Sequence, residues 1–236
     1  MTLKKKKKIL EGSTKKLYST DEPEHIIQEF MDTVLKDGES KSTIKGKGAI
    51  NNQICGHLFE YLEGFHIPTH FVKSIGNKEM LVKKLDMIPV EIFVHNIATG
   101  EFCKRFGQKD GQELELPIVE MFLKKPELNN PMINNGHVVA FGMATTEDIN
   151  QIERFSSKVN AVLKSFFTRR GLKLVDFKLE FGRHKEKIVL GDEISPDTFQ
   201  LWDSKTKERL GLDKITSGES TPESAYEDIF NRIFKS

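Results

Sequence analysis

Charged and apolar residues alternate in the run Leu174-Val175-Asp176-Phe177-Lys178-Leu179-Glu180-Phe181-Gly182. In a strand, successive side chains point to opposite faces, so Asp176, Lys178 and Glu180 would share one face. The opposite face would be wholly apolar and would consist of Val175, Phe177, Leu179 and Phe181. The run therefore predicts a strand that buries one side in a core and presents acid, base and acid on the other.

The charged face of this strand has two interpretations. Carboxylate oxygens are ligands that magnesium prefers, and a lysine ammonium binds phosphate, so the face suits a magnesium-nucleotide site. Alternating charges are also normal on the solvent side of an antiparallel sheet. A second acidic segment follows soon afterwards and favours the first interpretation; it reads Gly191-Asp192-Glu193-Ile194-Ser195-Pro196-Asp197.

The composition is that of an ordinary globular protein. The chain has 236 residues, of which 37% are hydrophobic and 30% charged, and this length allows one large domain or two small ones. The net charge is only +1, which gives no reason to expect a nucleic-acid partner. The basic run from Lys4 to Lys8 could bind a polyanion, but it leads directly into Ile9-Leu10 and is more typical of a solvated tail or a protected edge strand.

The cysteines and the hydropathy pattern point to the cytoplasm. Cys55 and Cys103 are the two cysteines, and their spacing suggests neither a disulfide framework nor a zinc site. No stretch approaches the ~20 apolar residues that span a bilayer, and no apolar segment follows the basic start. We therefore predict a cytoplasmic protein with no membrane or nucleic-acid partner; the sequence leaves a homo-oligomer open.

Secondary-structure signals in the first part of the chain predict a sheet with one helix against it. Short strands separated by a Gly-containing turn are expected around Ile9-Leu10 and Leu17-Tyr18. Apolar residues at helical spacing predict a helix over Ala49 to Leu62. Further strands are expected at Ile26 to Phe30, Phe71-Val72, Met80 to Leu85 and Val90 to Val94.

The second part begins with a different order of elements. A capping-box pattern at Thr145 to Asp148 starts an amphipathic helix that Gly171 would end. Strands are expected over Leu172 to Phe181 and Lys187 to Ile194, and Thr221-Pro222-Glu223 opens a last helix. The chain is therefore predicted to be an α+β protein with two lobes, residues 1–88 and 89–236, and a cleft between them beside the charged strand.

Two local motifs are weak signals by themselves. Gly12 and Lys15 could form a phosphate-gripping hairpin, but a single glycine in a hairpin is usually only a turn. His66 and His70 have the spacing of metal ligands on a helix, but Pro68 between them breaks the helical geometry, so we do not expect a metal there.

Several segments together resemble the phosphoribosylaminoimidazole-succinocarboxamide synthase (SAICAR synthetase) family, and the likeness covers nearly the whole chain. They are the charged strand and the acidic segment above, Leu201-Trp202-Asp203, Glu11 to Tyr18, Lys47 to Asn52, Ile67-Pro68-Thr69 and Leu81 to Glu91. The resemblance implies the family's two-lobed fold, with antiparallel sheets and a nucleotide cleft between the lobes.

The resemblance also implies an activity. Family members use ATP to join the carboxylate of carboxyaminoimidazole ribonucleotide to the amine of L-aspartate, in de novo purine biosynthesis. A carboxylate is a poor acyl donor, because its charge repels a nucleophile and its leaving group is oxide. Phosphorylation removes both obstacles, so an acyl phosphate intermediate is expected, with ATP and magnesium as cofactors.

Roles for individual residues follow from the same resemblance. The metal-binding acids would be Glu180 and Asp192, and Lys178 and Asp197 would be catalytic. The residues that would bind the nucleotide are Gly12, Lys15, Lys83, Leu85, Met87, Glu91 and Lys124. Those that would bind the other substrates are Lys104, Arg105, Ser195 and Asp197.

The chain departs from the family pattern at the acceptor half of the site. The family ordinarily has arginine where this chain has His95 and Gln200, serine where it has Glu101, and aspartate where it has Asn130. A charge-assisted hydrogen bond contributes roughly 1.5–3 kcal/mol, so the loss of two arginines predicts a weaker anion site and reduced activity.

Two alternatives to the ligase stay open at this stage. One is a nucleotide-binding homologue with lost or altered acceptor specificity. The other is a small-molecule phosphotransferase, against which the lack of a kinase-type catalytic-loop motif counts.

Overall fold

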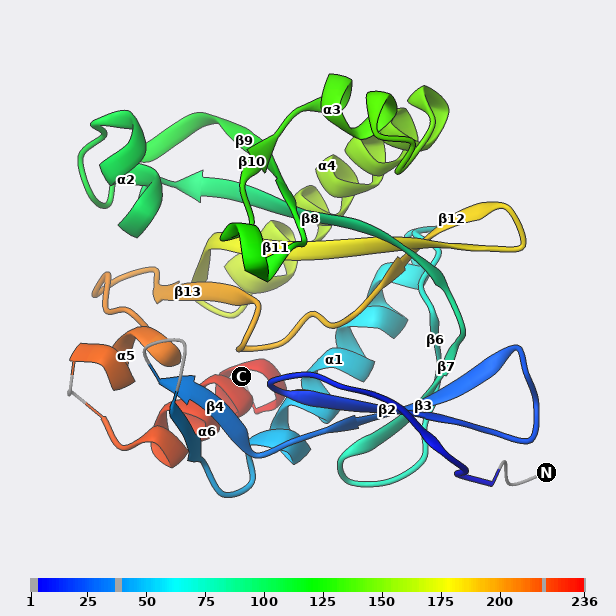
Figure 1. Cartoon of the computed structure of the whole chain (residues 1–236). Coiled ribbons are helices and arrows are strands. Elements are labelled where there is room, and N and C mark those ends of the chain that lie inside the picture. The colour runs from blue at the N-terminus through cyan, green and yellow to red at the C-terminus, as the bar shows by residue number, and fades with distance from the viewer. Residues whose placement is uncertain (1–3, 37–39, 218–219, 236) are drawn as a thin grey trace.

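Two antiparallel sheets form the framework of the protein (Figure 1). The computed structural model describes residues 4–36, 40–217 and 220–235. The first sheet has the strand order β1-β2-β3-β7-β6, and the second has the order β10-β9-β8-β11-β12 with β13 also paired to β11. A separate hairpin, β4 and β5, follows the third strand.

The elements of the first part are β1 (Lys8–Glu11), β2 (Lys15–Ser19), β3 (His25–Phe30), β4 (Thr33–Lys36), β5 (Ser40–Thr43), α1 (Lys47–Glu63), β6 (Phe71–Ser74) and β7 (Glu79–Lys83). The second part continues with β8 (Asp86–Ile97), α2 (Gly100–Phe106), β9 (Glu113–Leu123), a 3-10 turn η1 (Pro126–Leu128), β10 (Met132–Ile133), α3 (Asn135–Ala140) and α4 (Thr146–Thr168). The last elements are β11 (Leu172–His184), β12 (Lys187–Gly191), β13 (Phe199–Asp203), α5 (Leu212–Ser217) and α6 (Pro222–Phe234).

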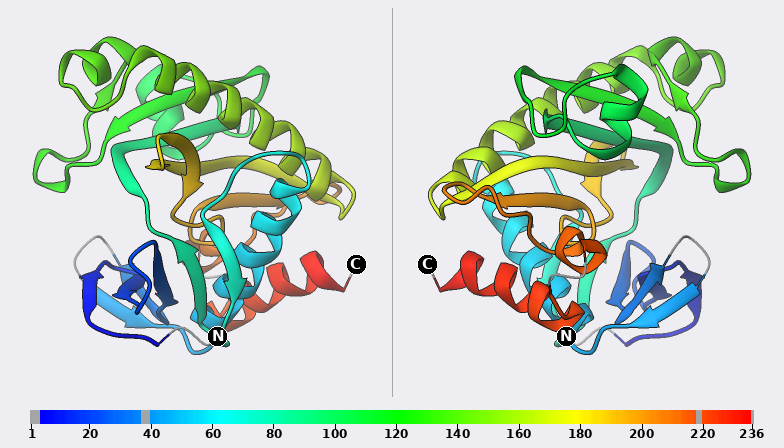
Figure 2. Two further views of the ribbon diagram at one scale, coloured as in Figure 1. Left: turned by 90° about the vertical axis from the view of Figure 1, so that its right-hand side faces the viewer. Right: turned by 90° about the vertical axis from the view of Figure 1, so that its left-hand side faces the viewer.

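The long helix α4 covers the apolar face of the second sheet (Figure 2). It begins with a capping box, in which the Thr145 side chain accepts from the Asp148 N–H and Asp148 accepts from the Thr145 N–H. Gly171, just after its end, adopts a φ of 68°, which allows the chain to turn directly into β11. The predicted helix start and stop are thus where the sequence placed them.

The predicted alternation of core-facing and opposite-facing side chains holds for most of β11 and fails at Val175. Phe177, Leu179 and Phe181 lie in the main core, as predicted. Val175 instead belongs to a small separate cluster with Ile97 and Trp202. The prediction that Val175 shares the core face is wrong because a bulge between Leu174 and Asp176 shifts the register against β13.

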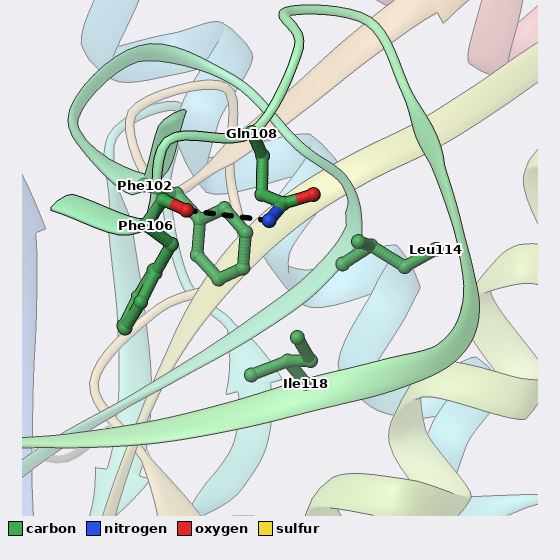
Figure 3. A pocket seen from close by; sticks show the side chains of 5 residues that line it. All are labelled: Phe102, Phe106, Gln108, Leu114 and Ile118. Carbon is green, nitrogen blue, oxygen red and sulfur yellow. Dashed lines mark hydrogen bonds between the residues drawn. The ribbon is translucent and has the colours of Figure 1, made fainter. Parts of the chain in front are cut away.

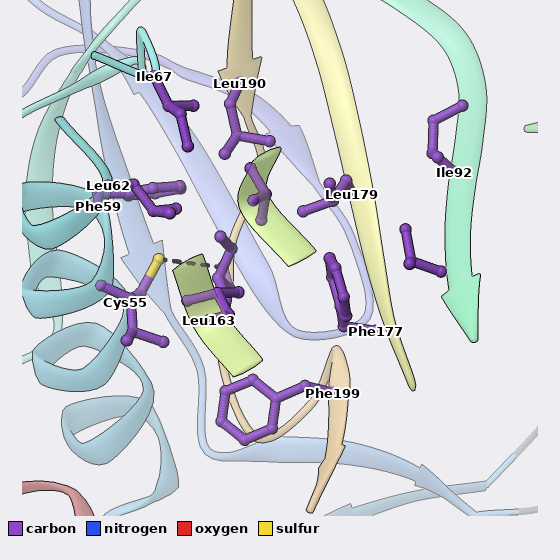
Figure 4. Close-up of a cluster of buried hydrophobic side chains, with 14 of the residues drawn as sticks. Cys55, Phe59, Leu62, Ile67, Ile92, Leu163, Phe177, Leu179, Leu190 and Phe199 are labelled. Atoms are coloured by element: carbon purple, nitrogen blue, oxygen red, sulfur yellow. Dashed lines mark hydrogen bonds between the residues drawn. The ribbon is translucent and has the colours of Figure 1, made fainter. Parts of the chain in front are cut away.

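One continuous hydrophobic core contains side chains from both sheets. Figure 4 shows side chains from α1, α4 and the strands of the second sheet in one cluster. The last helix, α6, packs against α1, so the end of the chain returns to the helix that covers the first sheet. The change from the first sheet to the second falls between Lys83 and Asp86, and the predicted boundary at residues 88 and 89 lies inside β8.

Candidate functional site

A cleft of about 540 Å³ lies between the two sheets. Its lining combines lysines, carboxylates and a few apolar side chains from both parts of the chain. The lining residues are Leu10, Gly12, Ser13, Thr14, Lys15, Leu17, Ile26, Gln28, His70, Lys83, Leu85, Met87, Glu91, Lys124, Pro126, Lys178, Glu180, Asp192, Glu193, Asp197 and Thr198. The structure therefore brings together every nucleotide-binding, metal-binding and catalytic residue that the sequence predicted.

The β1–β2 hairpin forms one wall of the cleft. The Gly12 N–H donates to the Lys15 carbonyl at 2.8 Å, which closes the turn and places Lys15 at the start of β2. The Lys15 ammonium then reaches the second part of the chain, 2.5 Å from Asp192 Oδ1 and 2.8 Å from Glu193 Oε1. The hairpin is thus held across the cleft by a lysine that lies between two carboxylates.

The charged face of β11 forms the floor of the cleft. The Lys178 ammonium donates to Glu91 at 2.8 Å and to Glu180 at 3.3 Å. The Lys124 ammonium donates to both oxygens of Glu180, at 2.7 and 2.6 Å. The Glu180 side chain is only 3% exposed, so this carboxylate is desolvated and its charge is balanced by the two ammonium groups.

The charges in the cleft shift one another's ionisation. Burial would raise the pKa of Asp192, but Lys15 and then Lys178 outweigh it and lower this pKa to about 2. Burial would lower the pKa of Lys15 and of Lys178, but the neighbouring carboxylates raise both. Burial and the charge of Asp192 raise the pKa of Glu180. The lysines therefore stay charged at neutral pH, as phosphate binding requires.

Asp192 ends its strand in an unusual backbone conformation. Its φ is 57°, in the left-handed region, so the ladder of β12 stops at Gly191 and the prediction of a strand as far as Ile194 is wrong. The Asp192 carbonyl accepts a hydrogen bond from Gln28 Nε2 at 3.1 Å. This bond from the first sheet and the Lys15 ion pair together aim the Asp192 carboxylate into the cleft.

The connection between the sheets forms the apolar end of the cleft. Lys83 is the last residue of β7, and its ammonium donates to the Thr69 carbonyl at 2.9 Å. Leu85 and Met87 follow and pass over Gly182, where a Cβ atom would lie 2.8 Å from the Asp86 carbonyl oxygen and 2.9 Å from Leu85 Cβ. The strand can approach this segment so closely because residue 182 has no side chain.

Replacing Gly182 by alanine should displace the Leu85 to Met87 segment. Overpacking of this kind costs about 1–3 kcal/mol, so we expect a lower denaturation midpoint and weaker ADP binding. Urea denaturation and calorimetric ADP titration measure the two effects. Gly76→Ala is the matched control, because a Cβ there would make only ordinary contacts, 3.7 and 3.8 Å from Glu79 atoms, and Gly76 does not line the cleft. Unchanged ADP affinity in Gly182→Ala would separate this segment from the nucleotide site.

Asp197 lines the cleft, whereas Ser195 lies beneath it. Both Asp197 oxygens are bound from below, one by the Lys47 ammonium and the other by the Tyr226 hydroxyl. The Ser195 hydroxyl donates to Glu193 and accepts from the Asp197 N–H at 3.1 Å. Ser195 is fully buried, so it supports the loop and is not itself part of the cleft lining.

Lys104 and Arg105 are not brought to the cleft lining. Lys104 is largely exposed on α2 and pairs with Glu101 at 2.5 Å. Arg105 binds Glu120 through both of its terminal nitrogens, and His95 Nε2 contacts the same carboxylate at 3.0 Å. Their predicted role in substrate binding stays a prediction.

Two other departures from the family pattern have local partners. Gln200 lies opposite Asp176 in the β11–β13 ladder, and the Thr99 hydroxyl lies 3.5 Å from Gln200 Oε1 and 3.2 Å from Asp176 Oδ2. Asn130 Oδ1 accepts from the Lys125 N–H at 2.8 Å. Gln200 and Asn130, like His95, therefore have their partners outside the cleft lining.

Sequence reasoning missed several residues that build the site. Gln28, Glu193, Lys47 and Tyr226 are all buried and bind predicted site residues. His70 was considered only as a metal ligand, but it lies against the cleft and its ring packs edge-on against Phe59. A polar residue at an otherwise buried strand position, as for Gln28 in β3, is the one signal that could have indicated such a role.

A second hollow, of about 390 Å³, lies between α2 and β9 (Figure 3). Its lining is apolar except for Gln108, whose side-chain amide donates to the Phe106 carbonyl at 3.2 Å. The other lining residues are Phe102, Phe106, Leu114 and Ile118. The hollow offers no charged group for a phosphate or a metal ion.

The carboxylates of the main cleft suit magnesium that is shared with a phosphate ligand. Among the described residues, no group of three or more His, Cys, Asp or Glu side chains could hold a metal alone. Magnesium usually takes one or two protein carboxylates and completes its shell with phosphate oxygens and water. Glu180 and Asp192, which line one cleft with four lysines, fit that pattern.

The lysines and carboxylates that line this cleft are typical of an enzyme that acts on a phosphorylated ligand together with a metal ion. Residues 8–233 match the SAICAR synthetase family. A phosphoribosylaminoimidazole-succinocarboxamide synthase of Chloroherpeton thalassium is 47% identical over 232 residues, which are 98% of this chain and 99% of that protein. The chain belongs to the SAICAR synthetase family.

Solved structures agree with this assignment. The synthase from Ehrlichia chaffeensis has a TM-score of 0.92 and 37% identity, and the match covers 96% of this chain and 98% of that one. A SAICAR synthetase in complex with ADP also has a TM-score of 0.92, with 41% identity and coverage of 96% and 97%. The predicted family, the α+β fold and the class of ATP-dependent ligase are confirmed. Across the described ranges, no helix is long and apolar enough to cross a membrane.

Proposed function

We propose that this chain joins carboxyaminoimidazole ribonucleotide to L-aspartate at the main cleft, with ATP as the phosphoryl donor and an acyl phosphate as the intermediate. The observation that carries the proposal is the array of Lys15, Lys124 and Lys178, each held by carboxylates on the walls or floor of one cleft. Three ammonium groups at one site suit a triphosphate, and the carboxylates among them suit its metal.

The proposed nucleotide position follows from the two ends of the cleft. The base would lie against Leu85 and Met87, and the phosphates would lie under the β1–β2 hairpin near Lys15. A relative of this chain was solved in complex with ADP. Magnesium would be held by Glu180 and Asp192, and when bound it would neutralise charge on the transferred phosphoryl group.

The chain's own groups would then position the reactants. Lys178 lies between Glu91 and Glu180 and would contact the oxygens of the carboxylate and the γ-phosphate as they approach. The substrate carboxylate attacks the γ-phosphorus, and ADP leaves. The aspartate amine attacks the acyl carbon, and phosphate leaves with one oxygen of the original carboxylate. Asp197 would accept a hydrogen bond from the attacking amine and orient it, and the proton that the amine loses would leave with the phosphate.

An assay of ADP release with substrates omitted one at a time tests the proposal. Rapid ADP release should require the ribonucleotide, magnesium and aspartate together. Rapid release without the ribonucleotide would favour a phosphotransferase or a simple ATPase. Absence of release with all components would favour a nucleotide-binding homologue that does not turn over. Neither of these alternatives has support from the confirmed family.

The raised pKa of Glu180 predicts a pH dependence. A carboxyl with a raised pKa takes up its proton at a higher pH than usual, and protonated Glu180 is a poor metal ligand. As the pH falls, activity should therefore decline with a midpoint above 4.5, the ordinary value for glutamate. The kcat/KM for magnesium-ATP, measured from about pH 4 to 8, checks this. A profile that stays flat to pH 4.5 would contradict it.

A further inference from the structure

Asp197 is held from below by two fully buried side chains from distant parts of the chain. The Lys47 ammonium, at the start of α1, pairs with Asp197 Oδ2. The Tyr226 hydroxyl, from the C-terminal helix α6, donates to Asp197 Oδ1. Both Lys47 and Tyr226 are 0% exposed, whereas Asp197 itself lines the cleft.

The backbone around Asp197 is fixed as well. The Ser195 hydroxyl accepts from the Asp197 N–H at 3.1 Å, and the Thr198 hydroxyl accepts from the Ser195 N–H at 3.0 Å. The same Ser195 hydroxyl donates to Glu193, which pairs with Lys15 at 2.8 Å. The loop that carries Asp197 is therefore linked through Ser195 and Glu193 to the phosphate-side lysine of the hairpin.

With Lys47 and Tyr226 bound, the Asp197 carboxylate can act toward the cleft only as a hydrogen-bond acceptor. A carboxylate has about four lone-pair sites, and Lys47 and Tyr226 each occupy one. Burial and the charge of Asp197 raise the pKa of Tyr226, so its hydroxyl stays protonated and always donates. The remaining lone pairs of Asp197 can only accept, and the open side of this residue is the cleft.

The helix that supplies Tyr226 is anchored at other points. Arg232 Nη1 donates to Asp203 Oδ2 at 2.6 Å, and Arg170 Nε donates to the Ile233 carbonyl at 2.9 Å. Ile229 and Ile233 lie in the main core. The position of the Tyr226 hydroxyl is thus set by contacts at the ends of β13 and α4, with residues that do not line the cleft.

We propose that Tyr226 and Lys47 are positioning residues that hold the Asp197 carboxylate toward the substrates, which makes the C-terminal helix a part of the active site. This inference rests on the proposed function, because it assigns Asp197 to the acceptor chemistry. A carboxylate held at both oxygens keeps its direction while the aspartate amine approaches, and such fixed orientation contributes to rate rather than to nucleotide affinity.

The variant Tyr226→Phe tests this role, because it removes only the hydroxyl and keeps the buried ring. We expect kcat for the complete reaction to fall about tenfold to a hundredfold, since the lost bond is one to a charged group. The KM for magnesium-ATP and the affinity for ADP should change less than about twofold. The control Tyr61→Phe removes a hydroxyl that binds Arg169 outside the cleft, and it should keep the wild-type kcat.

A double variant shows whether Tyr226 acts through Asp197. If it does, Tyr226→Phe combined with Asp197→Asn should be no slower than Asp197→Asn alone in single-turnover measurements. A wild-type kcat in Tyr226→Phe, an additive loss in the double variant, or equal losses of ADP binding and turnover would each overturn the inference. Inactivity of the wild-type protein toward the ribonucleotide would instead contradict the proposed function.

Discussion

Glu180→Gln is expected to lower kcat/KM for magnesium-ATP by about a thousandfold, or about 4 kcal/mol at ~1.4 kcal/mol per decade. The substitution keeps the volume of the side chain and removes its charge. It therefore takes away a proposed metal ligand, and it leaves Lys124 and Lys178 with less negative charge to bind. The loss of the metal ligand weakens the metal-phosphate complex at the point where charge develops during phosphoryl transfer, and this loss outweighs any gain in phosphate binding by the two freed ammonium groups.

Calorimetric titration with magnesium-ATP and steady-state kinetics measure this effect. Glu113→Gln is the matched control, because Glu113 is exposed and pairs with Lys173 outside the cleft. A surface ion pair contributes about 0–1 kcal/mol, so this control should bind and turn over as the wild type does. Equal affinity for magnesium-ATP in the wild type and Glu180→Gln would show that the metal assignment is wrong.

Lys178→Met is expected to lower kcat by about a hundredfold to a thousandfold while ADP affinity changes less than about tenfold. Lys178 lies on the floor of the cleft between Glu91 and Glu180. The ADP phosphates would instead lie under the β1–β2 hairpin. Its charge would matter most when the carboxylate and the γ-phosphate, both anions, are brought together. Loss of the ammonium should therefore affect the reacting complex more than the bound product ADP.

The same strand supplies the control for this variant. Lys173 is also on β11, but it is partly exposed and pairs with Glu113 at the surface, so Lys173→Met should keep a kcat within about twofold of the wild type. Single-turnover kinetics with the ribonucleotide compare the two variants directly. If Lys178→Met lost ADP affinity as strongly as kcat, Lys178 would bind nucleotide rather than promote the reaction.

The parts of this site that could be predicted from sequence are those coded by local patterns. The alternation in β11 placed Lys178 and Glu180 on one face and Phe177 and Leu179 on the other, as the structure has them. The hairpin around Gly12 follows from its turn, and the start of α4 follows from its capping box. Each of these signals lies within a few residues of the structure that it specifies.

The parts that could not be predicted depend on contacts between distant segments. The bond from Tyr226 to Asp197 joins α6 to a loop after β12, and Lys47 reaches the same carboxylate from α1. In the sequence Tyr226 is one more apolar position of an amphipathic helix, so its hydroxyl gives no local signal. The left-handed Asp192 is likewise bound by Gln28 and Lys15, which come from the other sheet.

The fate of the carboxylate oxygens tests the acyl phosphate and the proposed ligase together. Carboxyaminoimidazole ribonucleotide labelled with ¹⁸O in its carboxylate would be incubated with the protein, magnesium-ATP and L-aspartate, and the released phosphate would be analysed by mass spectrometry. One carboxylate oxygen leaves with phosphate in the proposed route, so each phosphate should carry one ¹⁸O atom. Phosphate without label, released at the same rate as ADP, would show that water and not the substrate carboxylate attacks ATP, and would contradict the account.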